Sequence, residues 1–204
     1  MLLLCSDGLT SDTIMDFLHS KLSDQQNAAL VVTADNQYKE RNYHVKRCIE
    51  ELERLGLRVE LFDLDHQPAE LLLGYNVVEF IGGNPFYLLH AIRENRCEAV
   101  IRELAARCIL IGWSAAAFVF GPGLGSAELY TPEMNFMGLK DLRGLALTDL
   151  EILPHYQRFL HKMEGFEERC QQYERDHHCT VLRLDDGDGI WIGQDGTPIL
   201  LCRK

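Results

Sequence analysis

From Cys108 to Gly121 the chain reads CILIGWSAAAFVFG, and this segment is the best guide to its architecture. Cys108–Trp113 is a continuous apolar run of the kind that forms buried strands. Ser114 ends the run, and small, helix-compatible residues follow at once. A strand that passes through a serine directly into a helix is typical of a nucleophile elbow, which exposes the hydroxyl at the carboxyl end of a sheet. A serine that only caps a helix gives the same pattern, so the segment alone leaves both interpretations open.

Similar apolar runs alternate with helical patterns along the N-terminal side of this segment. Short apolar strands between helices predict βαβ units and a parallel sheet whose two faces are both buried. We therefore expect an α/β fold with a doubly wound, mostly parallel sheet and helices on both faces. The apolar runs are Met1–Cys5, Ala28–Thr33, Arg58–Asp63 and Val77–Ile81, and the helical patterns are Ser11–Leu22, Tyr38–Leu57 and Phe86–Ala106.

The sequence pattern changes after Gly121. Glycines and prolines make Gly121–Asn135 loop-like, and Leu150–Leu153 is a short strand pattern. Arg158–Arg175 has the pattern of one polar helix. Three short strands joined by Asp-Gly and Gly turns predict C-terminal β-hairpins, at Thr180–Leu184, Gly189–Gly193 and Pro198–Cys202. Because no repeat or linker interrupts the chain, we expect one domain over residues 1–204.

Composition and charge exclude several classes of protein. The 204 residues are 47% hydrophobic and 25% charged, as in soluble globular proteins. A net charge of −11 argues against a general nucleic-acid binder, which needs a basic face. No apolar stretch approaches the roughly 20 residues of a membrane span, and no signal peptide is recognisable. Seven cysteines without a CxxC motif indicate free thiols in a reducing compartment, so we expect a cytoplasmic protein with no membrane or nucleic-acid partner.

Two further segments place chemically useful residues at strand ends, where open α/β sheets build their sites. Gly82 and Gly83 follow a strand pattern, and glycines there let the backbone approach a ligand, although a plain turn has the same sequence. Among the eight histidines, His155 is the one placed at the end of a strand, behind a proline, as a general base would be. The adjacent His177 and His178 have no third ligand at a suitable spacing, so we expect no metal site.

Taken together, these segments resemble a known family. The order is GGN at 82–84, GWSA at 112–115 and PHY at 154–156. It resembles the S51 peptidases, which include dipeptidase E and the cyanophycinases, from the second strand to the final hairpins. The resemblance implies a fold like the class I glutamine amidotransferases, with a serine in place of their nucleophilic cysteine. It also implies a serine peptidase that hydrolyses a small peptide through an acyl-enzyme without a metal or organic cofactor.

The resemblance assigns catalytic roles to residues of this chain. Ser114 corresponds to the nucleophile and His155 to the base. The family's third member is an acid that lies between them in sequence. Glu133 has the matching offset before the histidine, and Glu128 is the alternative. A Ser-His-Glu triad is therefore the expectation.

The resemblance also points to groups that bind the substrate. Dipeptidases of this family cleave after an N-terminal aspartate, and such a substrate needs a cationic contact. Arg169 is our candidate, with Arg158 and Lys162 beside it, although all three are also typical of solvated helix charges. Whether the chain forms a homodimer stays open. The oxyanion hole and neighbouring substrate contacts are assigned to Gly82, Gly83, Asn84 and Ala115.

The chain departs from the family pattern at three positions. Ala116 stands where the family has glycine, Pro85 replaces a threonine, and Glu133 replaces an aspartate. A methyl group at Ala116 could crowd the packing behind the elbow and impair the site. A catalytically impaired amidotransferase-like domain that binds a small ligand in the same cleft is therefore the alternative function. A structural or partner-binding α/β domain is a third hypothesis, for which no exposed motif speaks.

Overall fold

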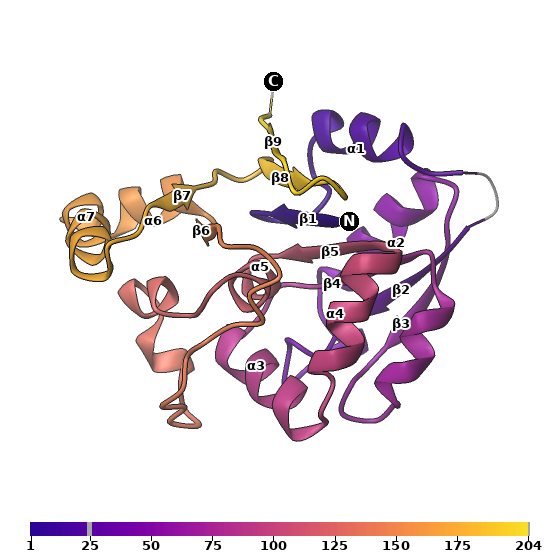
Figure 1. The fold of residues 1–204 in the computed structure, drawn as a ribbon, viewed down its shortest axis with the longest axis horizontal. Coiled ribbons are helices and arrows are strands. Elements are labelled where there is room, and N and C mark those ends of the chain that lie inside the picture. Colours follow the sequence, from indigo (N-terminus) through magenta and orange to yellow (C-terminus); the bar gives the residue numbers. More distant parts are fainter. Residues whose placement is uncertain (24–25, 204) are drawn as a thin grey trace.

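A computed structural model describes residues 1–23 and 26–203, and its centre is a seven-stranded sheet (Figure 1). The strand order is β3-β2-β4-β5-β1-β8-β9. The first five of these are parallel, whereas β8 is antiparallel to β1 and β9 to β8. The mostly parallel sheet predicted from the sequence is confirmed. The strands are β1 Leu2–Cys5, β2 Asn27–Val31, β3 Arg58–Phe62, β4 Val77–Phe80, β5 Ile109–Trp113, β8 Gly189–Ile192 and β9 Pro198–Leu201.

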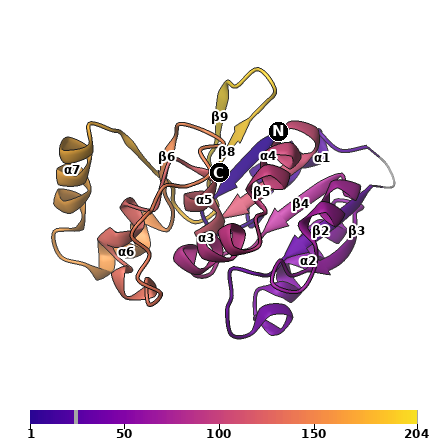
Figure 2. The ribbon, with the colours of Figure 1, turned by 60° about the horizontal axis from the view of Figure 1, so that its bottom comes forward.

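Helices cover both faces of the sheet (Figures 1 and 2). The chain first moves outward from β1 to β2 and β3, and then returns through β4 to β5. Because crossovers between parallel strands are right-handed, the outward and returning helices lie on opposite faces. On one side are α1 Asp12–His19 and α2 Val45–Arg54, and on the other α3 Pro85–Glu94 and α4 Glu98–Arg107. Within residues 1–23 and 26–203, no helix is both long and apolar enough to cross a bilayer.

A smaller unit lies beside the central sheet and is formed by the part of the chain between β5 and β8 (Figure 1). Helix α5, Ala115–Phe120, leads into a segment with two short 3₁₀ helices, Ser126–Leu129 and Pro132–Met134. Two short strands then pair in parallel as a separate sheet. This unit contains β6 Glu151–Leu153, α6 Tyr156–Lys162, α7 Phe166–His177 and β7 Val181–Arg183.

Three local predictions are corrected by the structure. The single helix expected over Arg158–Arg175 is two helices, because Gly165 adopts a left-handed conformation with φ +67° between them. The helix expected over Tyr38–Leu57 is shortened to α2, preceded by a 3₁₀ turn at Lys39–Arg41. Of the three C-terminal strands, β8 and β9 form a hairpin, whereas β7 pairs with β6. The turn between β7 and β8 therefore connects two sheets.

The strand order brings the segments singled out from the sequence to one edge. Strands β4, β5 and β1 are neighbours, with Phe80 paired to Gly112 and Cys5 paired to Trp113 at their carboxyl ends. The residues that come within two positions of these strand ends, among them Ser6, Gly82 and Ser114, consequently meet at the same edge. Ligand sites of open α/β sheets are formed at this edge, where the strand order reverses.

Candidate active site

Ser114 occupies the sharp turn that the sequence predicts between β5 and α5. Its backbone has φ +51° and ψ −108°, a strained conformation for a residue with a side chain. Such strain costs about 1–3 kcal/mol and persists where the surrounding structure enforces it. Here the Ser114 amide donates to the Cys5 carbonyl at 3.1 Å, which ties the turn to the end of β1.

His155 joins Ser114 to an acid. Its Nε2 lies 2.9 Å from Ser114 Oγ, and its Nδ1 lies 2.5 Å from Asp186 Oδ1. The ring is held where β6 ends, by a left-handed backbone with φ +58° at His155 itself. The side chain is 12% exposed, so the imidazole faces little solvent. Hydroxyl, imidazole and carboxylate form one continuous hydrogen-bonded row, which is the arrangement of an acyl-transfer triad.

Asp186 is held as an anion by its surroundings. Burial alone would raise its pKa, but hydrogen bonds from His155, Arg158 and Ser6 hold the pKa of this carboxyl well below its usual range. Arg158 donates to Oδ2 at 2.6 Å, and Ser6 Oγ donates to Oδ1 at 2.9 Å. A carboxylate fixed in this way can orient the imidazole and stabilise its protonated form.

Ser6, at the end of β1, connects both partners of the row and was missed from the sequence. Its fully buried hydroxyl accepts from the His155 amide at 2.8 Å while donating to Asp186. Its own amide donates to the Asp188 carbonyl at 3.0 Å. One hydroxyl therefore fixes the His155 backbone and the Asp186 carboxylate relative to each other.

The prediction that Glu133 is the acid of this row is wrong, because Asp186 occupies the position beside Nδ1. Glu133 is exposed in the 3₁₀ helix Pro132–Met134, and Glu128 is exposed in the preceding one. Asp186 follows β7, so it reaches the site from a strand end, as Ser114 and His155 do. An acid just after a strand was the available signal, but the turn was interpreted as part of a hairpin.

Ser114 opens into a pocket of about 400 Å³ that Gly82, Gly83 and Ala115 also line. The amides of Gly83 and Ala115 have no hydrogen-bond partner among the described residues, and both residues line the pocket, so these amides are the candidate donors to an oxyanion. Gly83 has φ +153°, and a Cβ there would lie 2.4 Å from the Ala34 carbonyl oxygen. A Cβ on Gly82 would lie 2.4 Å from the Trp113 ring, so neither position accepts a side chain.

The structure does not place Asn84 in the pocket lining. Its side chain caps α3, accepting from the Phe86 and Tyr87 amides at 2.9 and 3.1 Å. Its Nδ2 donates to the Met134 carbonyl at 2.8 Å. The expected substrate contact is therefore corrected to a structural role, which an Asn before a helix with proline at its first position could have indicated.

The cations around the pocket differ from those expected. Arg169 and Lys162 are exposed outside it, and the Arg169 guanidinium lies 5.8 Å from the centre of the Phe166 ring. Of the three candidates only Arg158 lines the pocket, together with Arg47 and His44 from the other side. Burial, with Arg47 and Arg158 nearby, lowers the pKa of His44, so this ring is neutral at pH 7.

Trp113 forms part of the pocket wall and is held from behind by Glu79 of β4. The indole Nε1 donates to Glu79 Oε1 at 2.9 Å. Glu79 is fully buried, and burial, reinforced by the neighbouring Glu51, raises its pKa to about 8. Glu79 is consequently protonated at neutral pH, a neutral acid in the core rather than a second charge at the site.

Ala116 fits behind the elbow without displacing it. The residue is fully buried, and a Cβ built on Gly112 would lie 3.1 Å from its methyl carbon and 2.6 Å from the Phe120 ring. Gly112 has no side chain, and the Ala116 methyl and the Phe120 ring use the space this leaves. Ser114 keeps both its strained turn and its 2.9 Å contact with His155.

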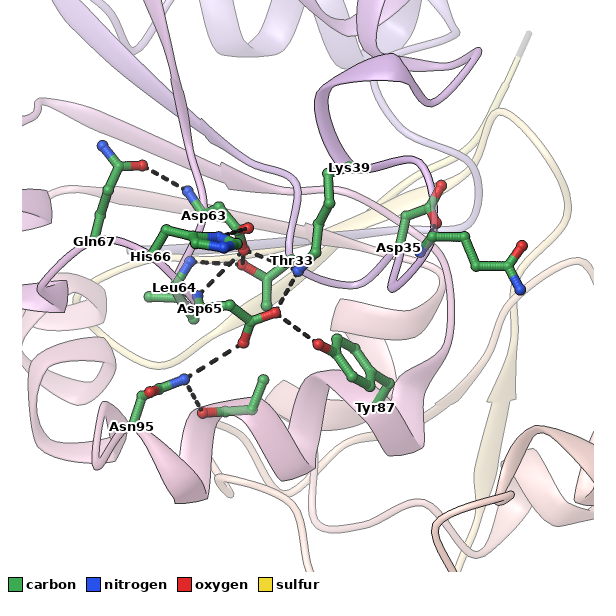
Figure 3. A network of polar contacts seen from close by, with 12 residues as sticks. Thr33, Asp35, Lys39, Asp63, Leu64, Asp65, His66, Gln67, Tyr87 and Asn95 are labelled. Atoms are coloured by element: carbon green, nitrogen blue, oxygen red, sulfur yellow. Dashed lines mark hydrogen bonds and ion pairs between the residues drawn. The ribbon is translucent and has the colours of Figure 1, made fainter.

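A second polar cluster lies at the ends of β2 and β3 (Figure 3). The Lys39 ammonium lies 3.0 Å from Asp63 Oδ1 and also pairs with Asp65. The Thr33 hydroxyl donates to Asp63 at 2.9 Å, and the Tyr87 hydroxyl donates to Asp65 at 2.6 Å. The cluster anchors the segment that leads to the pocket residues 42–44. In the described part of the chain, no group of three or more potential ligands is arranged to hold a metal ion.

Known proteins resemble the chain in sequence and in fold. The family model for peptidase family S51 matches residues 2–200. An uncharacterised peptidase of Listeria monocytogenes is 27% identical over 150 residues, 71% of this chain and 73% of that protein. Peptidase E of Salmonella arizonae is 28% identical over 162 residues, 77% of this chain and 69% of that protein.

Solved structures share the fold over nearly the whole chain. A crystal structure of a candidate peptidase E from Listeria monocytogenes superimposes with a TM-score of 0.77 and 23% identity, covering 100% of this chain and 98% of that one. A peptidase from an acI-B1 actinobacterium gives a TM-score of 0.60 at 16% identity, covering 93% and 81% of the two chains. With the family model matched from residue 2 to residue 200, the chain belongs to peptidase family S51 and is a serine-type peptidase.

Proposed function

We propose that the protein hydrolyses short peptides through an acyl-enzyme, with Ser114 as nucleophile, His155 as base and Asp186 as the acid. The observation that supports this most directly is the unbroken row from Ser114 Oγ through the imidazole to the Asp186 carboxylate, with contacts of 2.9 and 2.5 Å. These lengths suit proton transfer between positioned groups. The row opens into the pocket, so a substrate carbonyl can reach the hydroxyl.

In the first half-reaction, Ser114 Oγ attacks the scissile carbonyl carbon while His155 Nε2 takes the hydroxyl proton. The carbonyl oxygen becomes an anion, and the amides of Gly83 and Ala115 donate to it. The intermediate then collapses, the C–N bond breaks, and His155 gives its proton to the departing amine. In the second half, water attacks the ester with His155 again as base, which releases the acid and restores Ser114.

Asp186 keeps the imidazole in the tautomer that leaves Nε2 free to accept a proton. Its low pKa keeps it ionised, so it stabilises the imidazolium that forms in each half-reaction. Arg158 and Ser6 fix its two oxygens, which leaves the carboxylate one orientation. Residues from both ends of the chain are needed, in keeping with a single domain over residues 1–204.

The pocket volume of about 400 Å³ suits a short peptide. An N-terminal aspartyl dipeptide is one proposed substrate, suggested by the family resemblance of the sequence. Its carboxylate would meet Arg47 or Arg158, since Arg169 lies outside the pocket. Ala116, the residue that favoured a ligand-binding domain without activity, is accommodated, which supports an active enzyme over that alternative.

Labelling with a fluorophosphonate probe tests the proposal. We expect covalent modification of Ser114, identified by peptide mass spectrometry, and none in Ser114→Ala. The same two proteins are then assayed on a dipeptide library by release of free amino acids. A native protein that is neither labelled nor active on any peptide would refute the peptidase mechanism and leave the ligand-binding alternative.

A further inference from the structure

One wall of the pocket beside His155 is aromatic. It is formed by Phe118 of α5, Tyr130 of the following segment and Phe159 of α6. The Tyr130 and Phe159 ring centres are 3.9 Å apart, and the Phe118 and Tyr130 centres are 6.0 Å apart. Phe159 lies 6.4 Å from the imidazole of His155, centre to centre. Three rings drawn from separate elements thus form a continuous apolar surface next to the reacting groups.

The two arginines that line the pocket, Arg47 and Arg158, each already contact an acidic group of the chain. Arg158 donates to Asp186 at 2.6 Å, so its charge serves the acid of the row. Arg47 donates to the Asp7 carbonyl at 2.8 Å and lies 3.6 Å from Glu51. Asp7 also lines the pocket, so the pocket already contains an acidic side chain. An incoming carboxylate would have to compete with Asp186 for Arg158 and with Asp7 and Glu51 for Arg47, which adds to the cost of its desolvation.

We propose that the substrate residue beside the scissile bond carries an apolar side chain, preferably an aromatic one, that packs on Phe118, Tyr130 and Phe159. The inference rests on the proposed function, and it ranks an apolar side chain above the acidic one suggested by the family resemblance. Offset and edge-to-face packing against these rings favours a planar side chain over a branched aliphatic one. Burying a phenyl group in place of a methyl group corresponds to a preference of about 10- to 100-fold in kcat/KM.

A dipeptide panel measures this preference. Phe, Leu, Ala and Asp are placed in turn at each position, with Ala at the other, and kcat/KM is determined for each peptide. At one of the two positions we expect Phe to exceed Ala by about 10-fold and Asp by more. If there is no position at which the kcat/KM for Phe exceeds the values for both Ala and Asp, the proposal is overturned.

Variants test whether the wall itself produces the preference. Tyr130→Ala should reduce the Phe-to-Ala ratio of kcat/KM about 10-fold, because it removes the central ring of the three. Phe136→Ala is the matched control, since this aromatic lies on the same segment, is 62% exposed and does not line the pocket. The control should keep the native ratio. An unchanged ratio in Tyr130→Ala, or an equal loss in both variants, contradicts the assignment of the wall.

Binding to Ser114→Ala separates this proposal from the proposed function. Calorimetry on that variant should show tighter binding of the preferred Phe dipeptide than of its Asp counterpart, by about 10-fold or more. If this holds while the native protein hydrolyses nothing, the peptidase mechanism fails and the aromatic subsite stands. If the Asp dipeptide binds as well as the Phe dipeptide, or better, the subsite fails whether or not the protein is a peptidase.

Discussion

Two polar clusters share the carboxyl edge of the sheet and differ in where their hydrogen bonds lead. In the cluster at the ends of β2 and β3, the ammonium of Lys39 meets two carboxylates, and hydroxyl groups satisfy these carboxylates further. In the cluster around the elbow, the hydrogen bonds form a single row that connects Asp186 through His155 to a hydroxyl that lines the pocket. The clusters comprise Thr33, Lys39, Asp63, Asp65 and Tyr87, and Ser6, Ser114, His155 and Asp186.

Backbone strain does not distinguish the two clusters. Ser114 and His155 have φ of +51° and +58°, but Lys39 also has φ +51°. Both clusters are also largely buried and charged. What separates them is that the hydrogen bonds of the cluster around the elbow end at a hydroxyl group, Ser114 Oγ, which lines the pocket. The comparison teaches that a reactive site is recognised by the group left open to a ligand, rather than by the density of charge or strain.

Replacing Asp186 should have the largest effect. Asp186→Asn offers Nδ1 an amide and favours the wrong imidazole tautomer, so kcat should fall about 10³- to 10⁴-fold with little change in KM. Glu133→Gln is the control and should stay within about twofold of the native kcat. Steady-state kinetics on one peptide measures both. Comparable losses in the two variants would restore Glu133 as a participant.

Ser6→Ala should come next, with kcat lower by about 30- to 100-fold. The variant removes the donor to Asp186 and the acceptor for the His155 amide together. Ser126→Ala is its control, since the Ser126 hydroxyl is equally buried but has no partner within the described residues. Ser6→Thr, which keeps a hydroxyl, should recover part of the rate. Failure of that rescue would assign Ser6 to packing alone.

The Lys39 cluster should respond in stability rather than in chemistry. Lys39→Met removes the ammonium that Asp63 and Asp65 share, at side-chain exposures of 14% and 21%, and leaves Asp63 with the His66 ring at 2.8 Å. We expect a loss of about 2 kcal/mol in the free energy of unfolding, with kcat within about threefold of native. Lys46→Met removes an exposed lysine and should change neither. Urea denaturation measures the stability and steady-state kinetics measures kcat. A large fall in kcat would show instead that the Lys39 cluster contributes to the chemistry.

Glu79 of β4 lies between the strands that carry the two clusters and should affect the pH dependence of stability. Its folded pKa of about 8 exceeds the ordinary 4.5, so the folded state holds a proton that the unfolded state releases. Glu79 therefore lowers the stability as pH rises from about 4.5 to 8. Glu79→Gln should reduce that decline by about 1–2 kcal/mol, measured by urea denaturation at pH 5 and 8. Parallel curves for both proteins would contradict the assignment.

Ala116→Gly should have the smallest effect. Because the methyl group fits beside Gly112 and the elbow is intact, activity should stay within about threefold of native. The assay uses short peptides with apolar, neutral and acidic residues at the N-terminus. A gain of 100-fold or more, about 2.7 kcal/mol, would show instead that the native elbow is impaired.

The sequence predicted the parts of the site that depend on local patterns. The elbow at Ser114 and the strand-end His155 follow from an apolar run and the residue that ends it, so each could be placed without knowing its neighbours. The two glycines before Asn84 were identified by the same reasoning. Parallel strands bring such ends together, which is why the fold class and the meeting of these segments were predictable.

The remaining features depend on contacts between distant segments. Asp186 reaches His155 only because β7 pairs with β6 instead of forming a hairpin, and neither strand's pattern states its partner. Arg169 was assigned to the pocket on the assumption of one helix, but the break at Gly165 separates α7 from α6. Arg47 lies far from the motifs in sequence and enters the pocket from α2, with no local signal of its role.

The bond between Ser6 and Asp186 joins residues 180 positions apart, and it has a consequence during synthesis. Strand β1 is synthesised before the other strands of the sheet, yet it lies between β5 and β8 in the finished sheet. Ser114 and His155 are translated before Asp186, so in the proposed mechanism a nascent chain that lacks Asp186 holds a serine that is not yet activated. In the proposed mechanism, hydrolytic activity therefore requires that Asp186 has emerged and that β8 has paired with β1.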